Sequence, residues 1–217
     1  MSFWPEFLVV ASVHFVAVAS PGPDFAIILR YAVRHGVKVA LAASIGIGLG
    51  ILVHVAYSLL GIGLLLQTTP WLFQLFSAIA AAYLAYIGVQ ALRSAPPSQQ
   101  QDVAAEGKEQ VSLWQSFRAG LLTNGLNPKA TLFFLALFAV IISPQTPNSY
   151  KILYGVYMAF ATAAWFSLLS FLLTRQKVRL FLLQRGYWFD RIMGLVLLAL
   201  AMHLLFSAFI GSYTQNH

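Results

Sequence analysis

The chain has 217 residues, of which 59% are apolar and only 9% are charged, and its net charge is +7. A soluble domain carries roughly 25% charged residues, so this chain cannot cover a water-exposed surface, and lipid is expected to contact most of it. The basic residues lie scattered between apolar runs, where membrane topology requires them, which argues against a nucleic-acid partner. The sequence contains no Cys, which excludes disulfides, thiolate metal sites and thiol redox chemistry.

The predicted elements are six apolar segments, each long enough to cross a bilayer as a helix. Such a span needs about 20 mostly apolar residues at about 1.5 Å per residue. The segment that follows the fifth span, residues 175–187, is predicted to be a basic loop. The sequence therefore predicts an all-α integral membrane protein with six transmembrane helices, at residues 6–34, 39–66, 71–92, 116–142, 151–174 and 189–211.

A polar segment at 94–114 divides the chain into two three-helix repeats, residues 1–93 and 115–217. Because each half has an odd number of spans, the second is expected to be inverted relative to the first, as in many secondary transporters. The second helix of each half carries small residues at intervals of four, which let helix backbones approach closely in lipid. These stripes are Ala42, Gly46, Gly50, His54 and Ser58, and Gly155, Ala159, Ala163 and Ser167.

Lys and Arg are distributed very unequally between the two predicted sides of the membrane. Eleven of them follow the first, third and fifth spans, whereas the opposite side holds only Lys151. Cytoplasmic loops are enriched in Lys and Arg. The segment 94–114 is therefore predicted to be a cytoplasmic loop, and both termini are predicted to be periplasmic.

The first and fourth spans, which are the first helices of the two halves, are both interrupted. Pro suits the first position of a helix, so Pro23 and Pro128 are each predicted to open a second half-helix. Asn127 is a good N-cap residue, and Gly22 gives the backbone freedom to unwind. Gly and Pro interruptions at matching positions of two halves indicate the binding site of a transporter. The interrupting sequences are Ser20-Pro21-Gly22-Pro23-Asp24 and Asn124-Gly125-Leu126-Asn127-Pro128-Lys129.

Asp24 and Lys129 follow the two interruptions at equivalent positions. Each lies about 15 Å from the basic end of its span, near the bilayer centre, where a charge is costly and usually marks a pathway, a relay or a pair. One interpretation is a structural ion pair. The other is a site for a zwitterion such as an amino acid, in which Lys129, beside a half-helix N-terminus, holds the carboxylate and Asp24 holds the ammonium. The predicted binding residues are Asp24, Lys129, Ser20, Gly22, Pro23, Asn124, Asn127 and Pro128.

His14 and His54 are candidates, together with Asp24, for carrying a coupling proton, because imidazole titrates near neutral pH. A hydrogen-bonded packing role is the alternative for each, and for His203. Asp190 is predicted to be an interfacial charge at the end of a span. The sequence contains no nucleotide-binding Gly-rich loop, no metal-ligand spacing and no nucleophile elbow. It therefore predicts no enzyme, no cofactor and no metal site.

Two motifs carry a resemblance to a known family. The segment 13–25 resembles the first-helix signature of the LysE/RhtB family, and 120–130 resembles its second signature. The resemblance extends over nearly the whole chain in length, six apolar spans and the order of the motifs. It implies proton-driven export of amino acids or their derivatives across the bacterial inner membrane. The form His…Ser-Pro-Gly-Pro-Asp-Phe is similar to the threonine and homoserine efflux branch.

The predicted function is therefore a secondary transporter, surrounded by membrane lipid, that exports small neutral amino acids in exchange for protons. A homo-oligomer is compatible with the sequence. One alternative is an exporter of other small solutes or metal cations, although Lys129 would repel a cation. The other is a membrane assembly protein without transport activity, although a passive scaffold gains nothing from charges at the bilayer centre.

Overall fold

The computed structural model describes residues 3–68, 70–95, 110–143 and 145–213, and these ranges contain helices and no strand. Residues 96–109, most of the predicted polar loop, lie outside the described residues. The elements are α1 (Phe3–Ala19), α2 (Pro23–Arg34), α3 (Val37–Thr68), α4 (Pro70–Leu92), α5 (Leu113–Gly125), α6 (Pro128–Ala136), the π-helical turn η1 (Leu137–Ile141), α7 (Asn148–Leu172), α8 (Gln176–Arg185) and α9 (Tyr187–Tyr213).

Two helices of the described residues are long and apolar enough to cross a membrane, namely Val37–Leu60 within α3 and the whole of α7. The pair α1 and α2 makes a third if it counts as one span bent by 55°. Shorter apolar helices cover Ala81–Leu92 and Pro128–Ala139. The predicted all-helical membrane class is thus confirmed, whereas six spans in two inverted repeats stay a prediction.

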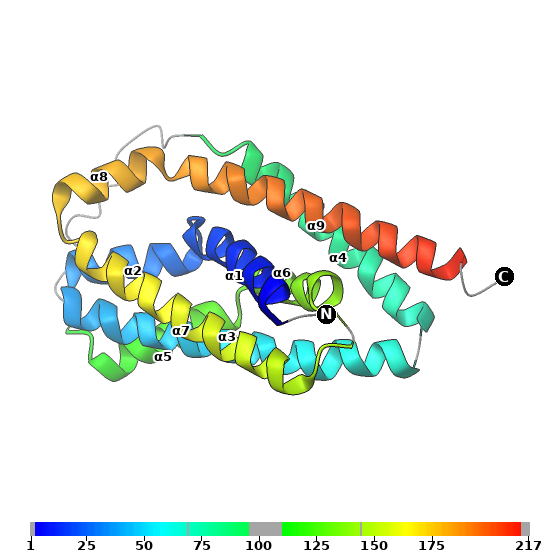
Figure 1. The fold of residues 1–217 in the computed structure, drawn as a ribbon. Helices are drawn as coiled ribbons and strands as arrows, with labels where there is room; N and C mark the ends of the chain where they lie inside the picture. Colours follow the sequence, from blue (N-terminus) through cyan, green and yellow to red (C-terminus); the bar gives the residue numbers. More distant parts are fainter. Residues whose placement is uncertain (1–2, 69, 96–109, 144, 214–217) are drawn as a thin grey trace.

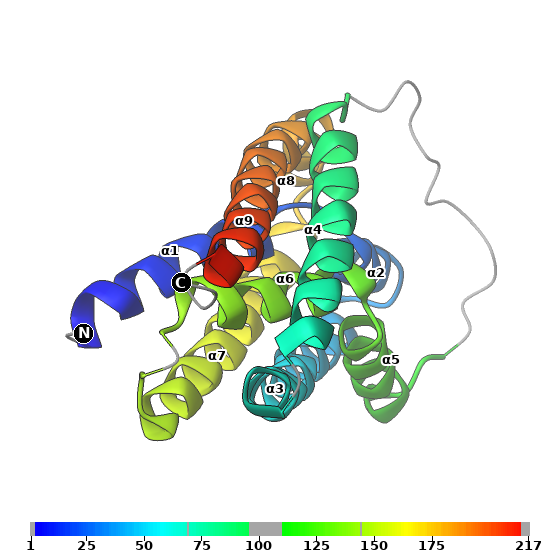
Figure 2. The ribbon, with the colours of Figure 1, turned by 90° about the vertical axis from the view of Figure 1, so that its right-hand side faces the viewer.

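The helices form two groups with α1 and α6 between them (Figures 1 and 2). In one group α3 packs against both α5 and α7, and in the other α4 packs against α9. The helices α1 and α6 lie between these groups and contact members of both. The second helices of the two predicted halves, α3 and α7, are therefore neighbours, as are the third helices, α4 and α9. This pairing of equivalent helices is compatible with a two-fold relation between the halves, which stays a prediction.

The small residues of α3 bring it into backbone contact with its neighbours. A Cβ atom added to Gly46 would lie 2.1 Å from the carbonyl oxygen of Phe117 in α5, and one added to Gly48 would lie 2.6 Å from the Cβ atom of Ala163 in α7. From the other side, a Cβ atom on Gly120 would lie 2.2 Å from the carbonyl oxygen of Ala43. These distances leave no room for a side chain, so close helix approach explains Gly46 of the first predicted stripe and Ala163 of the second.

Replacing Gly120 with alanine should destabilise the protein, because the new methyl group meets the rigid backbone of α3 rather than a movable side chain. We expect the free energy of unfolding to fall by roughly 1–3 kcal/mol, measured by denaturant titration of the purified protein in micelles. Gly125→Ala, on the same helix, is the matched control, because its Cβ atom would meet nothing within 4 Å. Equal unfolding midpoints for the two variants would contradict this packing.

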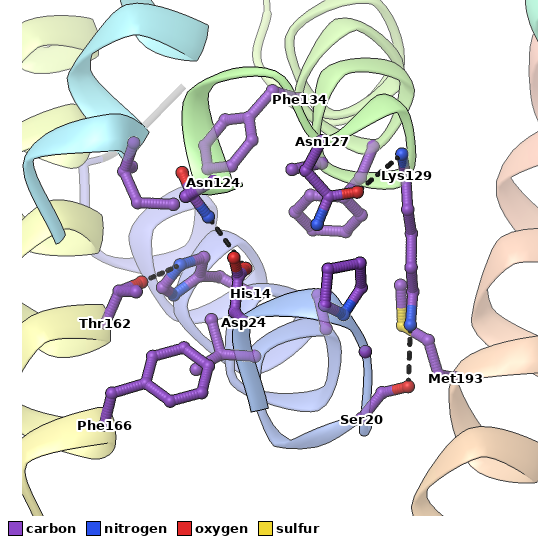
Figure 3. Close-up of a pocket in the computed structure, with 17 residues that line it drawn as sticks. His14, Ser20, Asp24, Asn124, Asn127, Lys129, Phe134, Thr162, Phe166 and Met193 are labelled. Carbon is purple, nitrogen blue, oxygen red and sulfur yellow. Dashed lines mark hydrogen bonds between the residues drawn. The ribbon is translucent and has the colours of Figure 1, made fainter. Parts of the chain in front are cut away.

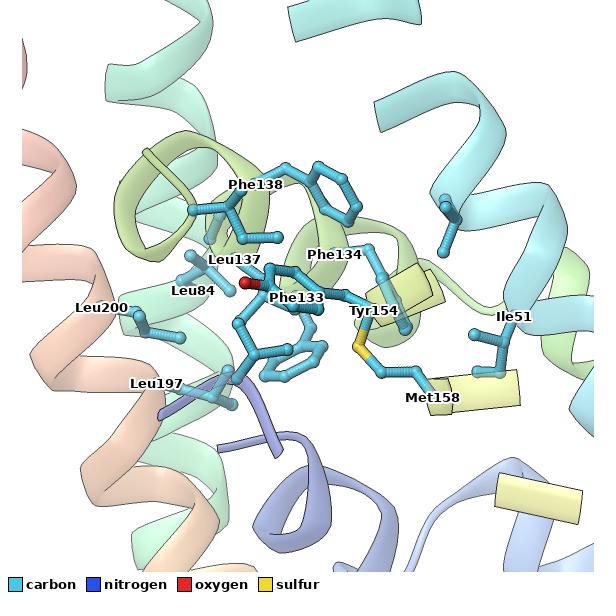
Figure 4. Close-up of a cluster of buried hydrophobic side chains, with 14 of the residues drawn as sticks. Ile51, Leu84, Phe133, Phe134, Leu137, Phe138, Tyr154, Met158, Leu197 and Leu200 are labelled. Atoms are coloured by element: carbon cyan, nitrogen blue, oxygen red, sulfur yellow. The ribbon is translucent and has the colours of Figure 1, made fainter. Parts of the chain in front are cut away.

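Two clusters of buried apolar side chains enclose the interruptions. The larger one gathers around α6 and includes Phe133 and Phe134 together with buried residues of α3, α4, α7 and α9 (Figure 4). The smaller one joins α2, α3 and α7 through residues such as Ile28, Ile47 and Phe166. Together they hold the ends of the four half-helices in place.

The predicted basic loop at 175–187 is wrong, because most of it forms α8. Its sequence, QKVRLFLLQR, lacks Gly and Pro and is rich in Gln, Lys, Arg and Leu, which are good helix formers. The fourth predicted span also differs from expectation at its start. Ser112 and Gln115 form a reciprocal cap that begins α5 at Leu113.

Candidate functional site

The first interruption lies between α1 and α2. As predicted, Pro23 occupies the first turn of the second half-helix, and Asp24 follows it. Gly22 is the N-cap residue with φ of −167°, an extended conformation that other residues also adopt. Backbone freedom is therefore not what requires glycine there. Space does not require it either, because a Cβ atom added to Gly22 would lie 4.0 Å from the Lys129 ammonium, an ordinary van der Waals distance.

The second interruption lies between α5 and α6, and Pro128 opens α6 as predicted. Asn127 is the N-cap residue, and its side-chain oxygen accepts a hydrogen bond from the backbone N–H of Lys129 at 3.0 Å. The cap pairs one of the N–H groups that a helix start leaves free. It also fixes the position from which the Lys129 side chain extends.

The two interruptions meet at a cavity of about 520 Å³, a volume that includes its open mouth (Figure 3). Pro128 and His54 do not line it, and His203 is exposed elsewhere on α9. Lining residues that the sequence did not indicate come from α3, α6, α7 and α9, among them Ile51, Phe134, Thr162, Phe166 and Met193. The predicted residues that line it are His14, Ser20, Gly22, Pro23, Asp24, Asn124, Asn127 and Lys129.

One wall of this cavity carries an unpaired hydrogen-bond acceptor. The side-chain nitrogen of Asn124 donates to Oδ2 of Asp24 at 2.9 Å. Within the described ranges, Oδ1 of Asp24 and Oδ1 of Asn124 are both buried and have no hydrogen-bond partner. Oδ1 of Asn124 packs against α3, 2.7 Å from the position of a Cβ atom on Gly50. Buried polar atoms in proteins are nearly always paired, so Oδ1 of Asp24 indicates a place where a ligand donates a hydrogen bond.

Lys129 stands across the cavity and does not contact Asp24 directly. Its ammonium donates to the hydroxyl of Ser20 at 2.8 Å, and that hydroxyl in turn donates to Oδ1 of Asp190 at 2.8 Å (Figure 3 shows the first of these bonds). In the described part of the chain, the Lys129 ammonium and the Asp24 carboxylate are more than 4.0 Å apart and form no ion pair. The structural ion pair considered above is therefore not formed as a direct contact.

Asp190 has partners that the sequence did not indicate. It lies half-buried in the first turn of α9 and accepts hydrogen bonds from Ser20 and Ser94, while its predicted place at the membrane interface stays a prediction. Its distance of 170 residues from Ser20 in the sequence explains why no local pattern indicated this contact.

The two candidate histidines have different surroundings. His14 is 2% exposed, lines the cavity and shares a hydrogen bond of 3.1 Å with the hydroxyl of Thr162. His54 lies behind the cavity wall, where its Nε2–H donates to the carbonyl oxygen of Asn124 at 2.9 Å and its Nδ1 accepts from Tyr57. Its ring also stacks on Phe134 with centroids 5.4 Å apart. His54 therefore supports Asn124, whereas His14 faces the space that a ligand would occupy.

The α7 residues of the cavity lie on a face next to the predicted stripe. Thr162 and Phe166 are four residues apart and share this face. The predicted stripe continues to Ala163, which packs against Gly48. Spacing alone does not distinguish the two faces, and the position of the first helix decides which of them lines the cavity.

Comparison with known proteins identifies the family. The family model described as LysE type translocator matches residues 15–208. The chain is 32% identical over 208 residues to the threonine efflux protein of Escherichia coli, covering 93% of this chain and 98% of that protein. It is 30% identical over 151 residues to the leucine efflux protein of Salmonella choleraesuis, covering 69% and 67%. No solved structure matches the chain. The protein belongs to the LysE type translocator family.

Proposed function

We propose that the protein is a secondary transporter that exports small neutral amino acids, and that it binds their zwitterionic backbone between Asp24 and Lys129. The observation that supports this most is the buried, unpaired Oδ1 of Asp24 in the cavity wall. An α-ammonium group has three N–H donors and a positive charge, and this carboxylate oxygen can accept from it. The substrate carboxylate would then lie at the Lys129 ammonium, in place of the neutral Ser20 hydroxyl that accepts from this ammonium in the structure.

The relatives support the substrate class. Their printed names describe efflux of threonine and of leucine, both of which are neutral amino acids. These substrates share the ammonium and carboxylate groups and differ only in the side chain. A site built on two opposite charges fits what they have in common.

The rest of the cavity suits a small side chain with a hydroxyl group. Phe133, Phe134, Phe166 and Met193 provide apolar walls, and Thr162 adds a hydroxyl that is already bonded to His14. The side chain of threonine or homoserine could share hydrogen bonds with this pair. We propose such hydroxylated amino acids as the preferred substrates.

Thr162→Val should reduce the preference for threonine over leucine about tenfold, because one net hydrogen bond to the substrate hydroxyl is lost while the side-chain volume is kept. The measurement is the ratio of efflux rates for the two labelled amino acids from the same cells. Thr174→Val is the matched control, because Thr174 lies beyond the end of α7 and bonds only the carbonyl oxygen of Phe171. An unchanged ratio would place the substrate side chain elsewhere.

Coupling to protons follows from competition at Asp24. A carboxylate cannot hold a proton and an ammonium group at the same time, so a proton that arrives from outside would release the substrate. His14, eight residues after the buried acid Glu6 and in the cavity wall, would assist that transfer. The basic side is predicted to be cytoplasmic and both termini periplasmic. In that orientation, the exchange would move amino acids from the cytoplasm to the periplasm across the bacterial inner membrane.

The direct test is efflux of labelled threonine, homoserine, leucine and lysine from cells with and without the protein. We expect faster efflux of the neutral amino acids and loss of that gain when a protonophore collapses the gradient. Unchanged efflux of the whole panel would favour other solutes or a non-transport role. Efflux that persists in the protonophore would reject proton coupling.

A further inference from the structure

A hydrogen-bonded chain runs from Lys129 to the start of α9, and the proposed substrate site does not explain its far end. The hydroxyl of Ser20 accepts a hydrogen bond from the Lys129 ammonium and donates one to Oδ1 of Asp190. The hydroxyl of Ser94, just after α4, donates to the second oxygen of Asp190 at 3.0 Å. Asp190 therefore ties together the interruption of the first span, the end of α4 and the start of α9.

This end of the molecule is closely packed around Asp190. Arg191 does not pair with its acidic neighbour; its Nε donates to the backbone oxygen of Ser94 at 3.1 Å, so Ser94 is held through both its hydroxyl and its backbone. A Cβ atom on Gly186 would lie 3.1 Å from the ring of Pro21, which places the start of α9 against the first interruption. Three residues after Asp190, on the same face of α9, Met193 lines the cavity.

We propose that Asp190 is a positioning residue that holds one end of the cavity closed through Ser20, and that the substrate carboxylate releases it. This inference rests on the proposed placement of that carboxylate at Lys129. A carboxylate binds an ammonium more strongly than a neutral hydroxyl does, so it would replace Ser20 as the acceptor. Ser20 then loses the cation that polarises it, and its bond to Asp190 weakens, because hydrogen bonds in a chain strengthen one another.

The consequence is a link between binding and opening. When the bond from Ser20 to Asp190 is weakened, the bond from Ser94 remains. The face of α9 that carries Met193 can then move away from the cavity. Glu6 and Thr146, whose side chains are hydrogen-bonded at 2.9 Å near the other end of α1, are about 20 Å along the helix from Ser20. That contact stays in place, so only one end opens.

The absence of Cys from the natural sequence makes this directly measurable. Ala17→Cys places a single thiol in the cavity wall. The rate at which a membrane-impermeant maleimide labels this thiol is measured without substrate, in inside-out vesicles for one face of the membrane and in whole cells for the other. Adding Asp190→Asn should speed labelling about tenfold or more from one side only, since a charge-assisted hydrogen bond is lost. Ser94→Ala should speed it from the same side by less. Glu6→Gln, the matched control, should leave the rate from that side unchanged.

A second measurement separates release of this contact from simple damage. For the purified protein, Asp190→Asn should tighten L-threonine binding about tenfold, because the substrate no longer competes with a closed state, while the maximal efflux rate falls. A merely structural role would weaken both. Asp190→Glu, which keeps the charge, should restore efflux at least in part.

The outcomes are distinguishable. Labelling that is unchanged from both sides, or faster from both sides equally, overturns the proposal. If Asp190→Asn does not accumulate in the membrane, the labelling of the Ser94→Ala variant decides the question. Faster one-sided labelling in a protein that binds neither L-threonine nor L-leucine would uphold the closing contact and reject the proposed function instead.

Discussion

Lys129→Met should abolish amino-acid export while leaving the protein in the membrane. Methionine is an unbranched side chain only one heavy atom shorter than lysine, so it keeps most of the packing but removes the ammonium that faces the cavity. A substrate carboxylate would then lie unpaired in a site of low dielectric. Removing one partner of such a charged contact costs about 2–5 kcal/mol, which corresponds to a loss of affinity of roughly 30-fold to several thousand-fold. The measurement is binding of L-threonine to the purified variant, together with efflux from cells.

The matched control is Lys38→Met, which removes an exposed lysine from the first turn of α3. It should leave binding and efflux within about twofold of the parent, because Lys38 does not line the cavity and salt screens the charge of an exposed side chain. The amounts of both variants in the membrane are compared first. If Lys129→Met exports threonine at the parental rate, Lys129 is not the carboxylate site, and the proposed zwitterion site fails with it.

Asp24→Asn should remove both substrate binding and proton exchange. Asparagine has nearly the same shape, but it has no negative charge for the ammonium group and cannot take up a coupling proton. We expect export to fall at least about 30-fold, since the loss of a buried charge partner again costs about 2–5 kcal/mol. The rate of proton-coupled exchange should also fall, even at saturating substrate. This result separates Asp24→Asn from a variant that only weakens substrate binding.

The geometry offers a stringent control for this result. The side chains of Asp24 and Asn124 are joined by a bond of 2.9 Å, so the double variant Asp24→Asn/Asn124→Asp moves the carboxylate to its neighbour and keeps the pair. We expect this double variant to recover part of the export that Asp24→Asn loses. Normal gradient-driven export by Asp24→Asn alone would refute the assigned role, and equal loss in both variants would show that the position of the charge, rather than its presence, is decisive.

The features of the site that could be predicted from the sequence obey local rules. Pro23 and Pro128 open half-helices because proline lacks the N–H that a first helical position leaves unpaired. Asn127 caps α6 because its short side chain reaches the N–H group two residues further on. Polar residues next to such breaks face the interior because lipid cannot pair them, and this brought Asp24, Asn124 and Lys129 into one cavity.

The parts that the sequence did not indicate depend on contacts between distant segments. Asp190 looked like a charge at a membrane surface because its neighbour is Arg191, yet its partners are Ser20 and Ser94. His54 is on the small-residue stripe of α3, and only the position of α5 shows that its ring bonds the backbone of Asn124 instead of facing the cavity. The helix α8 was hidden by its charges, although its residue types favour a helix.

The contacts between α3, α5 and α7 have a consequence for how the protein could work. Where one helix touches the next through main-chain atoms, as at Gly46 and Gly120, no flexible side chain lies between them to absorb a sliding motion. We therefore expect these three helices to move as a single rigid frame. Any alternation of the cavity between the two faces of the membrane would then come from the remaining helices, α4 and α9 above all, swinging against a frame that stays still.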